Sequence, residues 1–94
     1  MVADNCLTIR HSQHRLSYGD ARRISSYVLN AGPWKMVRLD LAGTTQTTTA
    51  ALAGLVLLRK KLLADGRDLR LVGLESRAGA LYDICRMDRL LPRE

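Results

Sequence analysis

The apolar run ALAGLVLLRKKLL, at residues 51–63, constrains the fold of this chain more than any other feature. The strand-like runs MVRLDL (36–41) and DLRLV (68–72) lie on either side of it. A helix with so wide an apolar surface needs a sheet to pack against. The order strand, helix, strand therefore predicts an α/β fold with parallel central strands joined by right-handed crossovers. The apolar positions of the helix recur at Ala51, Leu52, Leu55, Val56, Leu58, Leu62 and Leu63.

Weaker signals extend this alternation towards the N-terminus. Residues 7–9 and 14–16 have short strand-like patterns. Ser17 is a candidate N-cap for a helix that ends near Asn30, before Gly32-Pro33. The apolar stripe of this helix is expected at Ala21, Ile24, Tyr27 and Val28.

A third helix is expected after the strand at 68–72. Ser76 is predicted to cap this helix, and Gly66 to end the helix before the strand. No repeat or linker interrupts the pattern, so residues 1–94 are predicted to form a single domain. The third helix is expected to use Leu81, Ile84 and Cys85 as apolar contacts, and the chain then to fold back through Met87, Leu90 and Leu91.

Composition narrows the classes of function. The chain is 47% hydrophobic and 26% charged, with a formal net charge of +6, which is typical of a folded soluble domain. Its basic residues are spread among acidic ones and few aromatic residues accompany them, so we expect no nucleic-acid partner. The charge favours an acidic protein or an anionic lipid surface. The longest apolar run, 50–58, is too short to span a bilayer and no signal peptide is evident, which predicts a cytoplasmic protein without direct membrane insertion.

No catalytic or metal-binding motif is recognisable. The segment TTQTTTAALAG lacks the glycines and the lysine of a P-loop. His11 and His14 are the only imidazoles, and no base lies close to the threonines in sequence. With Cys6 the two histidines match no standard zinc spacing, and Cys6 and Cys85 are interpreted as buried thiols. We therefore expect a non-enzymatic protein without a metal or a cofactor.

The loop TTQTTTAAL, at residues 44–52, is the most unusual polar segment. It connects a strand to a helix N-terminus, where an open α/β sheet commonly presents its functional site. The free N–H groups there favour negative charge, including a phosphate that is carried by a ligand or attached to a hydroxyl. Thr48 or Thr49 is expected to cap the helix, which accounts for one or two of the threonines.

Several segments together resemble a STAS domain, the fold of anti-sigma factor antagonists and of the cytoplasmic tails of sulfate transporters. They are LDLAG, the helix ALAGLVLLRKKLLADG, the strand LRLVG and the closing segment LESRAGALYDICRMDRLLPRE. The resemblance is good over residues 36–94 and loose over residues 6–30, and is most specific at RKKLLADG and ICRMDRLLPR. It implies a STAS-type sandwich, with a mixed sheet of four to five strands and helices packed mainly on one face.

The resemblance also implies a site. In the bacterial antagonists an Asp-Ser-Ser-Gly-Leu-Gly signature follows the strand, and a partner kinase that is also an anti-sigma factor phosphorylates its second Ser. On this signature Thr48 matches the Asp, Thr49 the first Ser, Ala50 the phosphorylated Ser and Ala51 the Gly. The usual phosphorylated hydroxyl is therefore absent.

Three alternatives follow, the first two of which belong to partner-switching signalling and transcription regulation. Thr49, or Thr48, takes the phosphate instead. The chain is an antagonist-like module that is always competent to bind. Or it is the STAS accessory subunit of a lipid-transport ABC transporter, whose Asp-Thr-Ala-Gly-like signature matches Thr49-Ala50 and which docks on an ATPase subunit.

We expect the partner to be a protein, either an anti-sigma factor of the serine-kinase type or an ABC ATPase. The sequence does not decide whether the chain instead binds a nucleotide or an acyl chain. It also does not decide whether the chain forms a homodimer. The docking surface is predicted at loop 44–49 and the start of the helix, with the contact residues Thr45, Thr47, Thr48, Thr49, Ala50, Ala51, Ala53 and Gly54.

Overall fold

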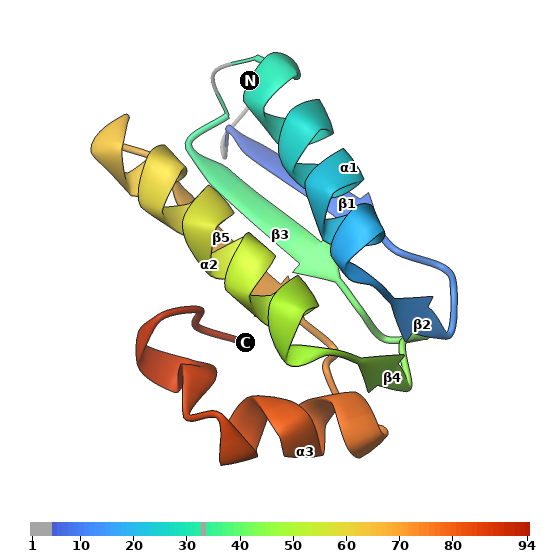
Figure 1. The fold of residues 1–94 in the computed structure, drawn as a ribbon. Coiled ribbons are helices and arrows are strands. Elements are labelled where there is room, and N and C mark those ends of the chain that lie inside the picture. The colour runs from blue at the N-terminus through green and yellow to red at the C-terminus, as the bar shows by residue number, and fades with distance from the viewer. Residues whose placement is uncertain (1–4, 33) are drawn as a thin grey trace.

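The computed structural model describes residues 5–32 and 34–94 and has three α-helices beside parallel β-structure (Figure 1). Pro33, part of the expected helix stop, lies outside the described residues. The elements follow in the order β1 (Cys6–Arg10), β2 (Arg15–Leu16), α1 (Tyr18–Asn30), β3 (Met36–Asp40), β4 (Gln46–Thr47), α2 (Thr49–Ala64), β5 (Asp68–Val72), α3 (Ser76–Ile84) and the short 3₁₀ helix η1 (Met87–Arg89). The predicted α/β alternation is therefore present.

The strands form two parallel groups. β3 is the central strand of one sheet, with β1 and β5 on either side, and β2 pairs with β4 in a second, two-stranded sheet. An isolated parallel bridge joins Leu71 to Arg93 near the C-terminus. This differs from the expected mixed sheet of four to five strands, because all the pairings among the described residues are parallel and β2–β4 stands apart from β1–β3–β5.

Local capping chemistry explains where the first two helices begin and end. Ser17 caps α1 through a capping box with Asp20, as the sequence indicated. After α2, the Gly66 N–H donates to the Leu63 carbonyl at 3.1 Å and the Arg67 N–H to the Leu62 carbonyl at 2.8 Å. Gly66 has φ of +74°, so this is a Schellman motif that depends on glycine. For α3, Glu75 occupies the N-cap position instead of the predicted Ser76.

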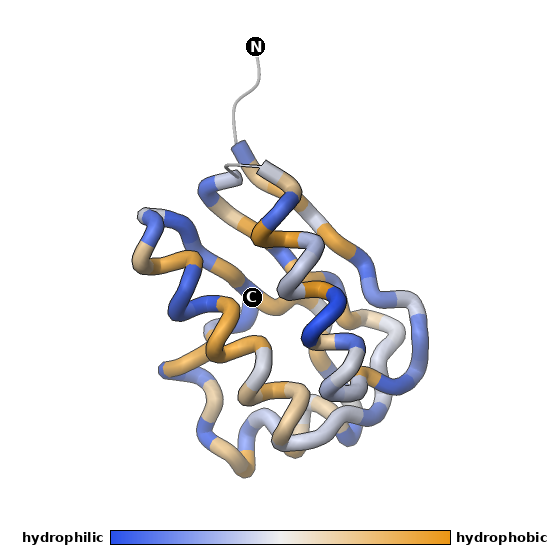
Figure 2. Tube along the Cα trace, turned by 45° about the horizontal axis from the view of Figure 1, so that its top comes forward, coloured by the Kyte–Doolittle hydropathy of each residue, from blue (hydrophilic) through white to orange (hydrophobic). Residues whose placement is uncertain are grey.

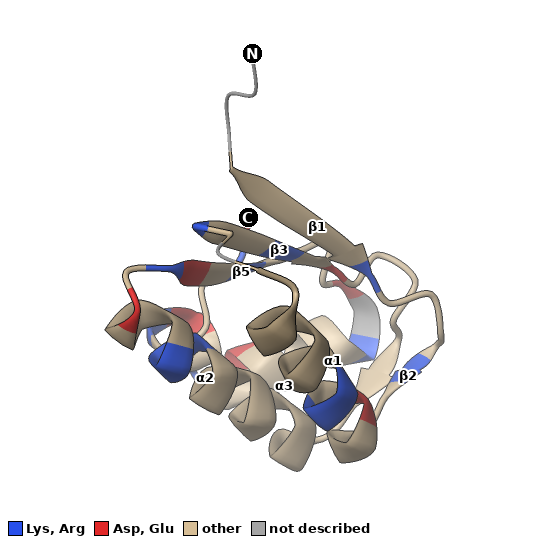
Figure 3. Ribbon diagram, turned by 90° about the horizontal axis from the view of Figure 1, so that it is seen from above, with Lys and Arg blue, Asp and Glu red and all other residues tan. Residues whose placement is uncertain are grey.

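The helices cover one face of the three-stranded sheet and leave the other open (Figure 3). Alternate residues of β3 and β5 point to the covered face, and Val37, Leu39, Leu69 and Leu71 are fully buried. α1 and α2 lie side by side on that face (Figure 1); hydrophilic residues recur along α1, whereas α2 has no charged residue before Arg59 (Figure 2). The core sits between these two helices and the sheet.

Three residues expected in the apolar stripes are exposed instead, namely Tyr27, Leu63 and Ile84, and so is Leu90, which was expected in the segment that folds back. Two helices that share one narrow sheet each bury only the part of their surface that meets the sheet or the neighbouring helix. Tyr27 in α1 and Leu63 in α2, at the margins of their stripes, therefore stay in solvent. The centre of the α2 stripe, from Ala51 to Leu62, is buried as predicted.

An ion pair joins the C-terminal half of α2 to β5. Arg59 Nε donates to Asp68 Oδ1 at 2.7 Å, and the Arg59 side chain is only 18% exposed. Burial acts to raise the pKa of Asp68, but the hydrogen bonds from Arg59 and from the Leu69 N–H outweigh it and hold the pKa below its ordinary value.

Candidate functional site

Hydrogen bonds connect the threonine loop, residues 44–49, to the segment before α1. Thr44 Oγ1 donates to the Gln13 carbonyl at 3.3 Å, Thr45 Oγ1 to the His14 carbonyl at 3.4 Å, and Thr47 Oγ1 to the Leu16 carbonyl at 2.9 Å. The backbone N–H groups of Thr45 and Gln46 also donate to the His14 carbonyl. Most of the hydroxyls therefore hold two distant segments together.

Thr48 is the N-cap of α2. Its extended backbone places Oγ1 3.1 Å from the Ala51 N–H, which donates to it. This confirms one of the two alternatives for the cap and makes Thr49 the first residue of the helix. Thr48, Thr49 and Ala50 are exposed. No hydrogen bond to a described residue holds the Thr49 hydroxyl.

The predicted contact residues fall into two groups. Ala51 is fully buried, so its side chain cannot reach a partner. A Cβ at Gly54 would lie 3.3 Å from Ala21 Cβ, so Gly54 brings α2 close to α1. Thr47 is half-buried and its hydroxyl is already bonded. The exposed members, which we call the docking surface, are Thr45, Thr48, Thr49, Ala50 and Ala53.

The start of α3 lies beside this surface, which the sequence pattern did not indicate. The Ala78 N–H donates to the Thr45 carbonyl at 3.1 Å, and α3 runs next to β4 (Figure 1). Glu75 and Arg77, near the start of α3, are exposed. No local signal in the sequence could have revealed this contact, because Thr45 lies before β4 and Ala78 lies in α3, far apart along the chain.

Side chains with catalytic chemistry occur near the N-terminus of α1. His11 Nε2 lies 2.8 Å from the Arg15 carbonyl and 4.0 Å from Asp20 Oδ2. Asp20 accepts hydrogen bonds from the backbone and side chain of Ser17, and it pairs with Arg23. With these contacts, the Asp20 carboxylate serves as a capping group of α1, and the His11 imidazole packs against the segment before α1. Within residues 5–32 and 34–94, no three His, Cys, Asp or Glu side chains gather in a way that could hold a metal ion.

Both cysteines are free thiols, as expected, but they are partly buried where the sequence predicted buried thiols. In the part of the chain that the structure describes, no helix is long and apolar enough to cross a membrane.

Comparison with known proteins gives the fold. No family model matches the chain, and no curated protein matches its sequence. The NMR structure of the protein TM1081 is similar with a TM-score of 0.79 at 17% identity, over 100% of this chain and 77% of that chain. The crystal structure of a sulfate transporter family protein from Wolinella succinogenes is similar with a TM-score of 0.74 at 19% identity, over 96% of this chain and 75% of that chain. These likenesses agree with the STAS-type fold expected from the sequence.

Proposed function

We propose that the chain is a non-enzymatic, STAS-type interaction module that docks on a regulatory kinase or anti-sigma factor through the docking surface. The observation that carries this proposal is the exposed face at the start of α2, with small side chains at Ala50 and Ala53 and the threonine loop hydrogen-bonded to the segment before α1. Small side chains let a partner approach the helix closely. Because the loop is already held by hydrogen bonds, it loses little conformational entropy on binding.

The residue at position 50 bears on whether the module is regulated by phosphorylation. In the resemblance it stands at the position of the phosphorylated Ser, and here it is an exposed residue in the first turn of α2. A phosphate at a helix N-terminus adds negative charge that can release a partner. Without a hydroxyl at this position the module stays competent to bind. Thr49 is the neighbouring hydroxyl through which regulation could still act.

A second candidate function is the accessory subunit of a lipid-transport ABC transporter. The pair Thr49-Ala50 favours it, because that pair matches the signature of this branch at two positions. The same docking surface would then bind an ATPase subunit. The similarity in fold to a sulfate transporter family protein is compatible with either candidate.

The substitution Thr49→Asp tests the docking surface. It adds one charge to the exposed first turn, where a carboxylate is compatible with the helix dipole, so the fold should be kept. We expect capture of the partner from the native lysate to fall by roughly tenfold, about 1.4 kcal/mol of binding free energy. Affinity purification with mass spectrometry then separates the candidates, since it recovers either a kinase or an ABC ATPase.

The matched control is Ala64→Asp, which places the same charge at the other end of α2, about 22 Å away along the helix axis. Capture by this variant should equal that of the wild type. If Thr49→Asp binds as well as the wild type, the docking surface is not the one proposed. Phosphate found on Thr49 in the purified protein would show a switchable module.

A further inference from the structure

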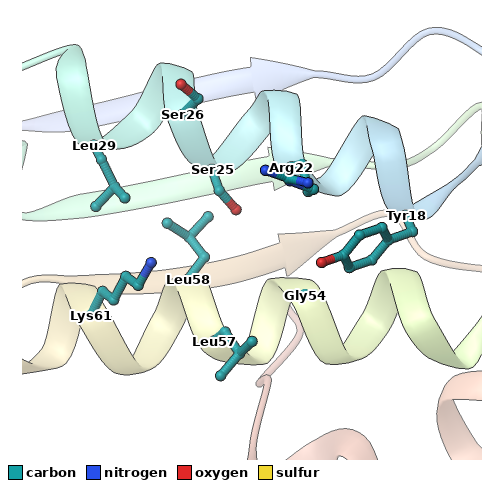
Figure 4. A pocket seen from close by; sticks show the side chains of 9 residues that line it. All are labelled: Tyr18, Arg22, Ser25, Ser26, Leu29, Gly54, Leu57, Leu58 and Lys61. Carbon is teal, nitrogen blue, oxygen red and sulfur yellow. The ribbon is translucent and has the colours of Figure 1, made fainter.

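A groove of about 280 Å³ runs along the outer surface of the protein between α1 and α2. Figure 4 shows Tyr18 near one end, Leu29 and Lys61 near the other, and Leu57 and Leu58 between them. Gly54 lies in the floor, where the two helix backbones come close. The groove is distinct from the docking surface, which lies at the N-terminal end of α2.

Three of the apolar side chains that line this groove are exposed, whereas Leu58 is buried. Leu57 is 57% exposed, Tyr18 is 49% exposed and Leu29 is 40% exposed. They come from both helices and lie around one hollow, where they alternate with polar and charged side chains. Exposed apolar side chains that gather around one hollow favour a binding site more than the same side chains scattered singly.

The charge of the groove has one sign. Arg22 lines it from α1 and Lys61 from α2, and neither Asp nor Glu is among the lining residues. The two cations lie towards opposite ends and on opposite walls (Figure 4). An occupant that complements them carries apolar side chains along its centre and carboxylates on its two flanks.

We propose that the groove binds an acidic amphipathic helix of a partner protein. From Tyr18 to Leu29 the groove follows α1 for about 16 Å, which equals about three turns of a helix. A helix of that length presents apolar residues at positions i, i+3 or i+4, and i+7 to the hollow around Leu57. Asp or Glu beside this stripe then meets Arg22 on one wall and Lys61 on the other.

Two other occupants fit less well. In a symmetric pair formed by a second copy of the chain, the same patch lies on both sides of the interface and two positive grooves are brought together. The net charge of +6 adds to that repulsion. An anionic bilayer would satisfy Arg22 and Lys61, but a flat surface does not fill a concave groove.

The test uses a phage-displayed library of helical peptides, with the residues of one face randomised. The library is selected on the protein of residues 1–94, and the selected peptides are titrated against it by fluorescence anisotropy. We expect selected helices to carry an apolar stripe flanked by Asp or Glu. Leu57→Ser should weaken binding by at least about tenfold, and Arg22→Glu and Lys61→Glu by several-fold each, with the loss reduced at high salt.

The chain supplies matched controls outside the groove. Leu63→Ser changes another exposed leucine of α2, and Lys60→Glu reverses a neighbouring cation, and both should leave peptide affinity unchanged. All these positions are at the surface, so the variants should fold. Thr49→Asp should not affect the peptide, which keeps this test separate from that of the proposed function.

Three results would overturn the inference. The first is that selected helices lack an acidic bias or bind Leu57→Ser and Leu63→Ser equally. The second is that the protein binds vesicles of phosphatidylcholine and phosphatidylglycerol through Arg22 and Lys61 and selects no helix. The third is a dimer in sedimentation that Leu57→Ser dissociates, which makes the second copy the occupant.

Discussion

At the scale of the residue, Asp20 makes several polar contacts at the start of α1. Its carboxylate accepts hydrogen bonds from the Ser17 N–H at 2.9 Å and the Ser17 hydroxyl at 3.0 Å, and pairs with Arg23, while only 7% of the residue is exposed. The Ser17 N–H is the main cause that lowers the pKa of Asp20; burial opposes it, and Arg23 and His11 add to the lowering. We predict that Asp20→Asn lowers the free energy of unfolding at pH 7 by about 1 kcal/mol, measured by urea denaturation.

The pH dependence of this loss identifies its cause. A carboxyl whose folded pKa is lowered stabilises the fold fully above its unfolded pKa of about 3.9, and this stabilisation is lost as the pH falls through the folded pKa. The difference between wild type and Asp20→Asn should therefore shrink below about pH 4. Asp83→Asn, at an exposed position, is the control and should change stability by less than about 0.5 kcal/mol. A difference that stays constant at acid pH would mean that the charge is not responsible.

At the scale of the element, the contact between α1 and α2 depends on Gly54. Because a Cβ at this position already comes within 3.3 Å of Ala21, a leucine there must push the helices apart. We predict that Gly54→Leu lowers stability by about 1–3 kcal/mol, despite the better helix propensity of leucine. Ala53→Leu adds the same side chain at an exposed neighbour and should leave the melting temperature nearly unchanged. Equal melting temperatures for the two variants would show that the helices separate without cost.

At the scale of the whole molecule, the segment after η1 closes the fold. Leu91 is fully buried, and its carbonyl accepts a hydrogen bond from the Tyr82 hydroxyl at 2.6 Å. The Leu71 N–H donates to the Pro92 carbonyl, and the Glu94 N–H donates to the Leu71 carbonyl, so the segment lies along β5. These contacts join α3, the C-terminus and the sheet.

Leu91 should therefore matter far more than its neighbour in sequence. We predict that Leu91→Ala lowers the free energy of unfolding by about 2–4 kcal/mol through the lost burial and the cavity that it leaves. Leu90→Ala is the matched control, because Leu90 is 48% exposed, and it should cost less than about 1 kcal/mol. Thermal and urea unfolding of both variants give the comparison. Similar losses would show that the C-terminal segment does not pack as described.

The sequence by itself determined most of the local structure. Ser17, Thr48 and Gly66 act at the ends of the first two helices because capping depends on residues only a few positions apart. The strand at 68–72 was predicted at its observed limits, since alternation of apolar residues is also a local signal. The α/β order followed from these elements.

Only the tertiary structure decided the use of each surface. Thr44, Thr45 and Thr47 bond to residues 13–16, and Ala51 is buried while Ala50 is exposed. The parallel pairings, the position of α3 beside the threonine loop and the groove between α1 and α2 likewise join segments that are distant in sequence. Periodicity tells which residues share one side of a helix, but which side is covered, and by what, depends on how the whole chain packs.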